Sequence, residues 1–310
     1  MSYASDVKKE LTMLEVHPEH AKAELAALIR LNGTLKQTHN HIRVTIQTEN
    51  AAIARRIYSL IKDLFDVQAE ISVRRRMKLN KNNVYFIRLN QQAKQILMEL
   101  EIFEVMLHEL SLPKSIKGNE QKARSYLRGA FLARGSVNSP ETNSYHLEIH
   151  SNDKVMNEDN FEMMKRFDLN PKMHERRNGG YMTYLKEAEK IADFLGIIGA
   201  NNSLFHFEDI RIVRDMRNSV NRLVNCEQAN LNKTVDAATK QIEAILRIDE
   251  EFGLESLPEK IQEIATLRLE NPEASLKELG ELLPGEPISK SAVNHRMRKL
   301  VKMADEIGVS

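Results

Sequence analysis

The chain has 310 residues, 42% of them hydrophobic and 29% charged, which predicts a globular protein of two or three domains. Its single cysteine, Cys226, excludes an internal disulfide and a cysteine-based zinc site, and is typical of a reducing cytoplasm. No apolar run approaches the roughly 18 residues that span a bilayer, so we expect no membrane span and no membrane partner. With a net charge of only +1, any strongly basic surface must come from local segregation of charge.

Two segments of the chain look alike. Residues 25–33 and 127–135 are both apolar, helix-like runs that end in glycine. Each is followed by a strand, a helix, a basic strand pair and a closing helix, so the same order occurs twice at a spacing of about 100 residues. A repeat of that length indicates a duplicated domain rather than a solenoid unit. The further predicted elements are 42–48, 50–65, 68–89 and 92–100 in the first half, and 145–150, 153–167, 172–184 and 186–197 in the second.

The halves are separated by residues 112–118, where proline and glycine break helices. A long helical stretch without Gly or Pro follows the second half, from about 208 to 251, and its polar segment 225–233 is a candidate interruption. Within that segment we expect Cys226 to be a packed small residue rather than a nucleophile. Gly253 and Pro258 then precede the last domain.

The tail carries three helical signals. The first is a helix over 258–269, and it is terminated by Asn271-Pro272. The second, 276–283, starts after a capping box made by Ser275 and Glu278. After the turn 284–287, Ser289 caps a third helix that runs towards Glu306. The expected inward positions are Leu276, Leu279, Leu282 and Leu283 on the second helix, and Ala292, Val293 (or Met297), Leu300 and Val301 on the third.

Charge distinguishes the third helix from the other two. Residues 289–302 contain five Lys and Arg side chains and no acid, whereas most acids of the tail lie in the earlier helices. Such a helix can present polar side chains to base edges and cations to phosphates, which predicts a DNA-binding helix-turn-helix over Ser275 to Gly308. The alternative is a basic, solvated helix in a small interaction bundle. The candidate DNA-contacting residues are Ser289, Lys290, Ser291, Asn294, His295, Arg296, Arg298, Lys299 and Lys302.

The segments 2–11, 221–231 and 289–300 closely resemble the bacterial WhiA family, and the resemblance covers essentially the whole chain. It implies an α+β fold: a duplicated LAGLIDADG-like (αββαββα) domain, then a helical linker and an all-α helix-turn-helix domain similar to that of sigma factors. The expected boundaries are 1–111 and 112–205 for the two halves, 206–255 for the linker and 256–310 for the helix-turn-helix domain.

The resemblance to LAGLIDADG homing endonucleases implies where a catalytic metal would be. In those nucleases each of the two central helices ends in a carboxylate that holds Mg²⁺, because a hard cation needs anionic oxygen ligands. The matching positions here are Asn32, a weak neutral ligand, and Arg134, a permanent cation. Glu24 lies about two helical turns earlier and cannot substitute. We therefore expect a degenerate motif with no catalytic residue, metal or cofactor. His17, His20, His146 and His150 are expected to be structural.

The same resemblance implies a sheet that faces the major groove of DNA. Basic side chains on the predicted strands would supply salt-sensitive phosphate contacts. An exposed polar face, or a surface for protein partners, explains these residues equally well. The possible secondary contacts are Arg43, Arg74, Arg75, Arg76, Lys78 and Lys81 in the first half, and Lys172, His174, Arg176 and Arg177 in the second.

The leading hypothesis is a non-enzymatic, double-stranded-DNA-binding regulator. The resemblance implies roles in transcription, cell division and chromosome segregation, in sporulation in some bacteria, and a cytoplasmic, nucleoid-associated location. RNA polymerase or another transcription regulator is a candidate partner, and we expect a monomer with an internal pseudo-two-fold axis. The alternatives are a metal-dependent homing endonuclease and an interaction scaffold on the nucleoid or on RNA polymerase.

Overall fold

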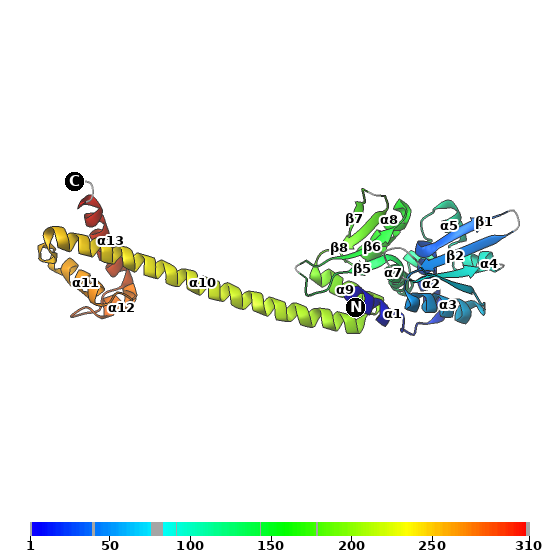
Figure 1. Cartoon of the computed structure of the whole chain (residues 1–310), viewed down its shortest axis with the longest axis horizontal. Coiled ribbons are helices and arrows are strands. Elements are labelled where there is room, and N and C mark those ends of the chain that lie inside the picture. Colours follow the sequence, from blue (N-terminus) through cyan, green and yellow to red (C-terminus); the bar gives the residue numbers. More distant parts are fainter. Residues whose placement is uncertain are drawn as a thin grey trace. The chain divides into compact units, whose positions relative to one another are not determined.

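The computed structural model describes residues 2–38, 41–75, 83–90, 92–142, 144–177 and 179–307. The chain divides into two compact units, Met1–Arg214 and Asp215–Ser310, and the division falls inside helix α10 (Asn201–Phe252) (Figure 1). Among the described residues, no helix is long and apolar enough to cross a membrane.

The N-terminal unit contains the same arrangement twice. The first sheet has the strand order β1-β2-β4-β3 and the second has β5-β6-β8-β7, with every neighbouring pair antiparallel. This identity of topology confirms the predicted duplication and the α+β fold class. The first copy consists of α2 (Pro18–Asn32), β1 (Gly33–Gln37), β2 (Ile42–Thr48), α3 (Ala51–Phe65), β3 (Glu70–Arg75), β4 (Asn83–Leu89) and α4 (Ala93–Glu99). The second consists of α7 (Glu120–Arg134), β5 (Gly135–Val137), β6 (Leu147–Ser151), α8 (Lys154–Arg166), β7 (Lys172–Glu175), β8 (Tyr181–Leu185) and α9 (Ala188–Ile198).

The central helices α2 and α7 pack against each other between the two sheets (Figure 1). Gly129 makes this approach possible: a Cβ at this position would lie 2.3 Å from the Glu24 carbonyl oxygen and 2.8 Å from the Ala27 Cβ. Ala26, Ala27 and Ala130 are fully buried at the same seam. These small residues therefore allow α2 and α7 to pack closely.

Strand β2 exposes one face and buries the other. Along β2, Val44, Ile46 and Thr48 are buried, while Arg43 and Gln47 are exposed. This alternation follows from the two-residue period of a strand, and it leaves one face of the sheet packed against helices and the other open.

Helix α1 (Tyr3–Leu11) was not among the predicted elements. Its Tyr3 hydroxyl donates to the carbonyl oxygen of Ser203 at 2.7 Å. The Glu10 carboxylate accepts from the backbone N–H groups of Asn202 and Ser203, at 2.8 and 2.9 Å. These donors are the free N–H groups of the first turn of α10, so α1 caps that helix.

Two short helices, α5 (Phe103–His108) and α6 (Lys114–Lys117), connect the halves, and α6 occupies the predicted break.

Two expectations for α10 were wrong. The polar segment 225–233 does not interrupt the helix, because it contains no Gly or Pro and its polar side chains are exposed along an unbroken backbone. Cys226 is exposed rather than packed, since it lies in that solvated segment.

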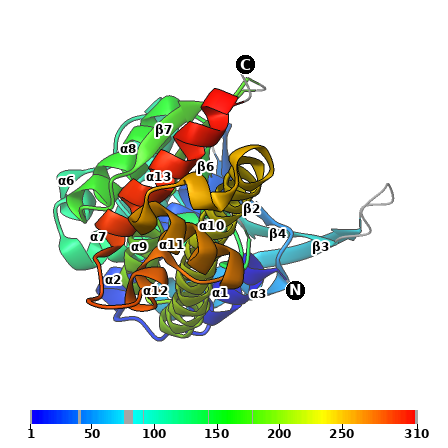
Figure 2. The same cartoon turned by 90° about the vertical axis from the view of Figure 1, so that its left-hand side faces the viewer.

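The C-terminal unit has a core of its own. A short 3₁₀ turn, η1 (Leu254–Ser256), leads into α11 (Glu259–Glu270), α12 (Leu276–Glu281) and α13 (Lys290–Ile307) (Figure 2). Side chains from all three helices and from the end of α10 form one apolar cluster, which includes Ile245, Ile264, Leu279, Val293 and Leu300. Leu282 was expected in this core, but it follows the last residue of α12 and is 50% exposed.

Candidate nucleic-acid interface

Helix α13 begins where the sequence predicts. The Ser289 hydroxyl accepts a hydrogen bond from the Ala292 N–H at 3.3 Å, as an N-cap residue does. The buried positions are Val293, Met297, Leu300 and Ala304, at helical spacing. Val293, Met297 and Leu300 were expected on this face. Ala304 extends it, whereas Ala292 and Val301 are only half-buried.

The opposite side of α13 carries an exposed stripe. Ser291, His295, Arg298 and Lys302 are separated by four, three and four residues, so they lie on one side of the helix, and all four are exposed. Lys290 and Lys299 are exposed on its flanks. We call Ser291, His295, Arg298 and Lys302 the α13 stripe. It combines hydroxyl and imidazole groups near the start of the helix with cations further along, and residues 289–302 contain no acid.

Two of the predicted contact residues lie beside this stripe. Arg296 is half-buried, and its Nη1 donates to the Lys260 carbonyl oxygen of α11 at 3.3 Å. Asn294 is half-buried as well. The structure therefore separates outward-facing residues from flanking ones, which the sequence alone treats as equivalent. Gly308, the predicted end of the motif, lies outside the described residues.

The helices before α13 fix its position. The predicted capping box at α12 is present: the Ser275 hydroxyl accepts from the Glu278 N–H, and the Glu278 carboxylate accepts from the Ser275 N–H. Gly280 lets the turn approach α12, because a Cβ there would lie 2.4 Å from the Ile288 carbonyl oxygen. Arg268 is buried and its Nη1 donates to the Ala274 carbonyl oxygen at 2.6 Å, which ties the loop between α11 and α12. Desolvation by burial lowers the pKa of this guanidinium.

In the N-terminal unit, the two degenerate motif positions come together at the ends of α2 and α7. The Nε of Arg134 donates to Oδ1 of Asn32 at 3.0 Å. A cavity of about 800 Å³ opens beside this pair. Within the described ranges, no group of three or more His, Cys, Asp or Glu side chains is arranged to hold a metal ion. A cation and a neutral amide thus occupy the end of the seam, and neither offers an anionic ligand.

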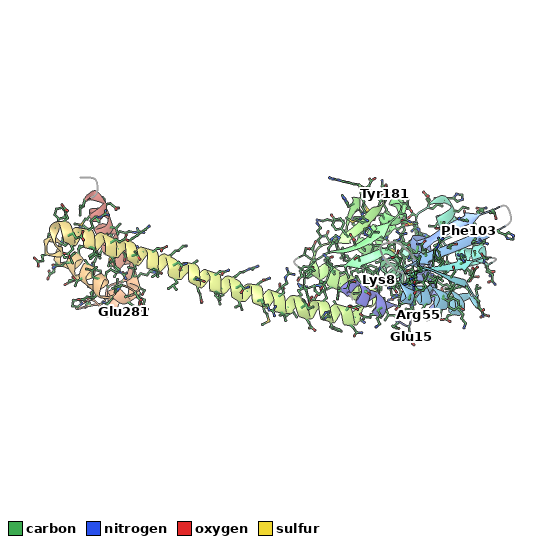
Figure 3. All side chains as sticks on the ribbon, viewed as in Figure 1. Lys8, Glu15, Arg55, Phe103, Tyr181 and Glu281 are labelled. Atoms are coloured by element: carbon green, nitrogen blue, oxygen red, sulfur yellow. The ribbon has the colours of Figure 1, made fainter. Side chains whose placement is uncertain are left out.

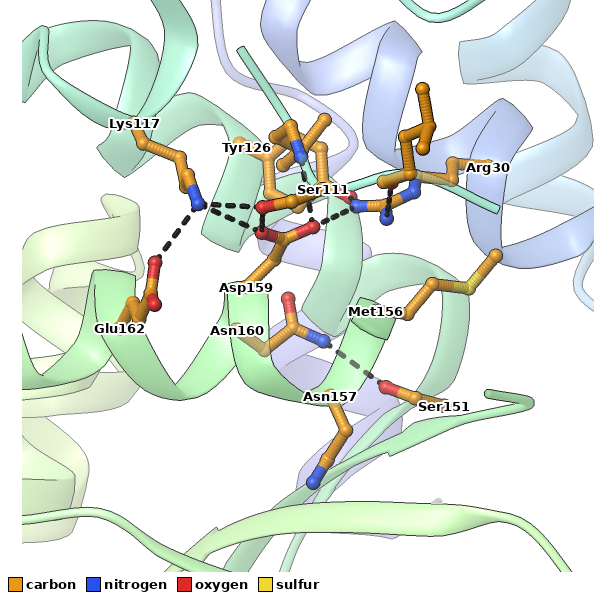
Figure 4. Close-up of polar contacts among 12 residues, drawn as sticks. Arg30, Ser111, Lys117, Tyr126, Ser151, Met156, Asn157, Asp159, Asn160 and Glu162 are labelled. Carbon is orange, nitrogen blue, oxygen red and sulfur yellow. Dashed lines mark hydrogen bonds and ion pairs between the residues drawn. The ribbon is translucent and has the colours of Figure 1, made fainter. Parts of the chain in front are cut away.

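A buried ion pair that no local sequence pattern indicates joins the two halves (Figure 4). Arg30 of α2 donates from Nη1 to Asp159 of α8 at 2.7 Å, and both side chains are at most 2% exposed. The Asp159 carboxylate also accepts from the Ser111 hydroxyl, the Leu112 N–H and the Lys117 ammonium, at 2.6, 3.1 and 3.1 Å. Several donors therefore satisfy the buried carboxylate, which is the condition under which an internal charge is tolerated.

A second buried carboxylate, Glu24, sits further along α2. It accepts from Nε of Arg128 on α7 at 2.7 Å and from Nε of Arg56 on α3 at 2.9 Å. Because these partners are 104 and 32 residues away, only the fold reveals the contacts. The available sequence signal was a charged residue within an apolar helical run, which is unusual for a core position.

The first sheet presents its predicted basic residues on two different faces. Arg43 is exposed, and its Nε donates to Oδ1 of Asn90 at 2.9 Å. Strand register places Arg74 on the same face as Arg43 and Arg75 on the opposite face. Arg76, Lys78 and Lys81 lie outside the described residues.

The second sheet carries a mixed-charge surface. Lys172 and His174 are exposed on β7, Arg177 lies in the turn that follows, and Nη1 of Arg176 lies 3.2 Å from Nδ1 of His150. Between His146 and His150, Glu148 lies 3.0 and 2.9 Å from their Nε2 atoms. Burial alone would raise the pKa of Glu148, but hydrogen bonds from the two histidines outweigh it and lower that pKa. The acid makes this face less cationic than the basic residues alone predict.

These features define a class of protein in which a duplicated LAGLIDADG-like domain precedes a helix-turn-helix. Three family models match the chain: the WhiA N-terminal LAGLIDADG-like domain at residues 18–103, the WhiA LAGLIDADG-like domain at 123–217 and the WhiA C-terminal HTH domain at 220–304. The chain belongs to the WhiA family.

Relatives with this family name are similar over their full length. The probable cell division protein WhiA of Enterococcus faecalis is 62% identical, over 99% of this chain and 98% of the relative. That of Staphylococcus epidermidis is 58% identical, over 99% and 98%. The crystal structure of full-length DUF199/WhiA from Thermatoga maritima has 28% identity and a TM-score of 0.60, and covers 99% of this chain and 98% of that one.

Proposed function

We propose that this protein is a non-enzymatic, double-stranded-DNA-binding regulator that reads DNA with α13. The observation that carries the proposal is the α13 stripe: an exposed, acid-free row of polar and basic side chains opposite the packed face of a helix-turn-helix. This arrangement suits a recognition helix, whose inner face must be anchored while its outer face enters the major groove.

The roles of the stripe residues follow from their chemistry. Ser291, His295 and Arg298 can donate hydrogen bonds to base edges, and a guanidinium can bond both O6 and N7 of guanine. Lys302, with Lys290 and Lys299 on the flanks, would contact phosphates, which position the helix without reading sequence. Arg296 and Asn294 would support the helix and contact DNA at the edge of the interface. Ser289 would cap the helix.

Cell division is the process in which we place this activity, because the full-length relatives are named probable cell division proteins. We propose that it acts there by regulating transcription and chromosome segregation, and sporulation in bacteria that sporulate. A nucleoid association follows from DNA binding, and RNA polymerase or another regulator is the candidate protein partner. We retain the monomer with an internal pseudo-two-fold axis, and the boundaries 1–111, 112–205, 206–255 and 256–310, as parts of the proposal.

Secondary DNA contacts by the N-terminal sheets are a weaker part of the proposal. Arg43 and Arg74 share one open face and can meet phosphates together. Arg75 would require a different surface, and Glu148 opposes phosphate binding by the second sheet.

Chromatin immunoprecipitation with sequencing tests the proposal in cells, and fluorescence anisotropy with an enriched fragment tests it in solution. The wild-type chain should enrich discrete sites, and Arg298→Ala should lose them while the exposed control Lys154→Ala keeps them. Diffuse enrichment that is unchanged by Arg298→Ala would instead favour an interaction scaffold on the nucleoid or RNA polymerase.

A plasmid-nicking assay tests the non-enzymatic part. With Mg²⁺ and supercoiled DNA, the wild-type chain should leave the plasmid intact, because Asn32 and Arg134 provide no anionic metal ligand. Cleavage that disappears in Asn32→Ala or Arg134→Ala would establish a homing endonuclease instead.

A further inference from the structure

The cavity beside Asn32 and Arg134 has a chemistry that the proposed function does not use. Its volume of about 800 Å³ is within the range of small-molecule sites. The walls come from α1, the ends of α2 and α7, β1, β2 and the start of α3. The polar lining includes Asn32, Thr34, Gln47, Thr48, Asn50 and Asn152.

Two cations line this cavity. Lys8, labelled in Figure 3, lies on α1 and lines the cavity, and its Nζ lies 5.8 Å from the centre of the Phe131 ring. Arg134 uses its Nε to hold Asn32. Among the described residues, neither cation forms an ion pair with a carboxylate, and no protein hydrogen bond from the Arg134 Nη atoms is present. Both side chains therefore have donors available to a ligand.

The surroundings of Lys8 disfavour its charged form, and the cavity walls also include one acid, Glu49. Burial lowers the pKa of Lys8 to about 8, so the folded chain favours the neutral amine more than an exposed lysine would. The other charged residues among the described cavity walls are Arg134 and Glu49. A desolvated cation that lacks a carboxylate partner is costly to stability, and such groups are concentrated at binding sites.

We propose that this cavity binds a phosphate group without a metal ion, through Lys8 and Arg134. A phosphate oxyanion matches the available groups, because the planar guanidinium can donate to two oxygens and the ammonium supplies a point charge. The neutral amides and hydroxyls of the wall complete the hydrogen bonding. The phosphate belongs either to a free nucleotide or to a DNA backbone that enters the cavity.

Calorimetry with the full-length chain in EDTA distinguishes these two sources. The probes are inorganic phosphate, ATP and a short DNA duplex, and the variants are Lys8→Met and Arg134→Met. The matched controls are Lys9→Ala on α1 and Arg124→Ala on α7, which are outside the cavity. We expect at least one probe to bind the wild type, and each cavity variant to bind it about tenfold more weakly, which corresponds to one lost charged contact.

The outcomes are separable. If the cavity variants bind phosphate or ATP more weakly than the wild type, the cavity's ligand is a free phosphate compound. If they bind only the duplex more weakly, the ligand is the DNA backbone. Binding should also weaken between pH 7 and 9 in the wild type and not in Lys8→Met. Because α13 also binds the duplex under the proposed function, the cavity is tested by the difference between cavity variants and controls. Equal duplex binding by variants and controls, together with no phosphate or ATP binding that the cavity variants weaken, overturns the proposal. Circular dichroism melting verifies that each variant is folded.

Discussion

The α13 stripe and the Asn32–Arg134 cavity both present cations beside neutral polar groups, but they do so on surfaces of opposite shape. The stripe lies on the outside of a helix, with Arg298 and Lys302 exposed. The cavity is recessed at the end of two packed helices, and its Arg134 is held by Asn32. An outward helix face can enter a groove and contact many phosphates and bases, whereas a recess can hold one anionic group. We therefore expect the same residue types to bind different ligands on a protruding helix face and in a recess.

The largest expected effect tests the buried ion pair that joins the two halves of the N-terminal unit. Arg30→Ala removes one cation from the buried Asp159 carboxylate and leaves Lys117 as the other. The free energy of unfolding should therefore fall by about 3 kcal/mol, the lower end of the cost of breaking a buried ion pair. Denaturant melts of the N-terminal unit measure this, with Arg124→Ala as the control, because Arg124 pairs with Glu120 at the surface. A loss for Arg30→Ala no larger than for the control would mean that the pair does not hold the halves together.

The next effect tests the stripe. Arg298→Ala should weaken binding to the specific DNA site by about 1–3 kcal/mol and relax specificity at one base pair, if the guanidinium reads a base. Arg296→Ala should have a smaller effect, since its side chain already donates to the Lys260 carbonyl oxygen. Anisotropy titrations with the specific site and single-base variants measure both. A larger loss for Arg296→Ala would show that the outward stripe is not the reading face.

Lys8 allows a test of the cavity by pH. Its pKa is about 8 in the folded chain against an ordinary value of 10.5, so folding releases a proton between these values. The free energy of unfolding should therefore rise with pH from about 8 to 10.5 through this group. Lys8→Met should remove that increment and stabilise the chain at pH 7 by about 1 kcal/mol or more. Identical melting of wild type and variant at pH 7 and pH 10 would contradict a desolvated Lys8.

The smallest effect concerns phosphate contacts of the stripe. Lys302→Ala should weaken binding to all DNA sequences alike and reduce the slope of log affinity against log salt by about 1, through one phosphate contact. Its 3.9 Å pair with Glu306 is exposed and contributes little. Affinities at four salt concentrations provide the slope. An unchanged slope with lost specificity would reassign Lys302 to base reading.

Local patterns predicted much of this fold. The repeat, the capping box at Ser275 and the start of α13 at Ser289 all depend on residues close together in sequence. Other features depend on distant partners: Arg30 and Asp159 are 129 residues apart. The face of Arg75 depends on strand register, and the half-buried position of Arg296 depends on α11. Sequence periodicity alone indicated neither the face of Arg75 nor the burial of Arg296, because a neighbouring strand or helix decides each position.

The hydrogen bond between Asn32 and Arg134 has a consequence for protein engineering. Both residues stand at the ends of α2 and α7 while the packing behind them, from Gly129 to the buried Glu24, is independent of their side chains. Replacing both with aspartate would put two acids at one end of the seam without disturbing its core. The end of the seam can therefore accept new side chains, and Asn32→Asp with Arg134→Asp is a compact starting point for directed evolution of metal binding.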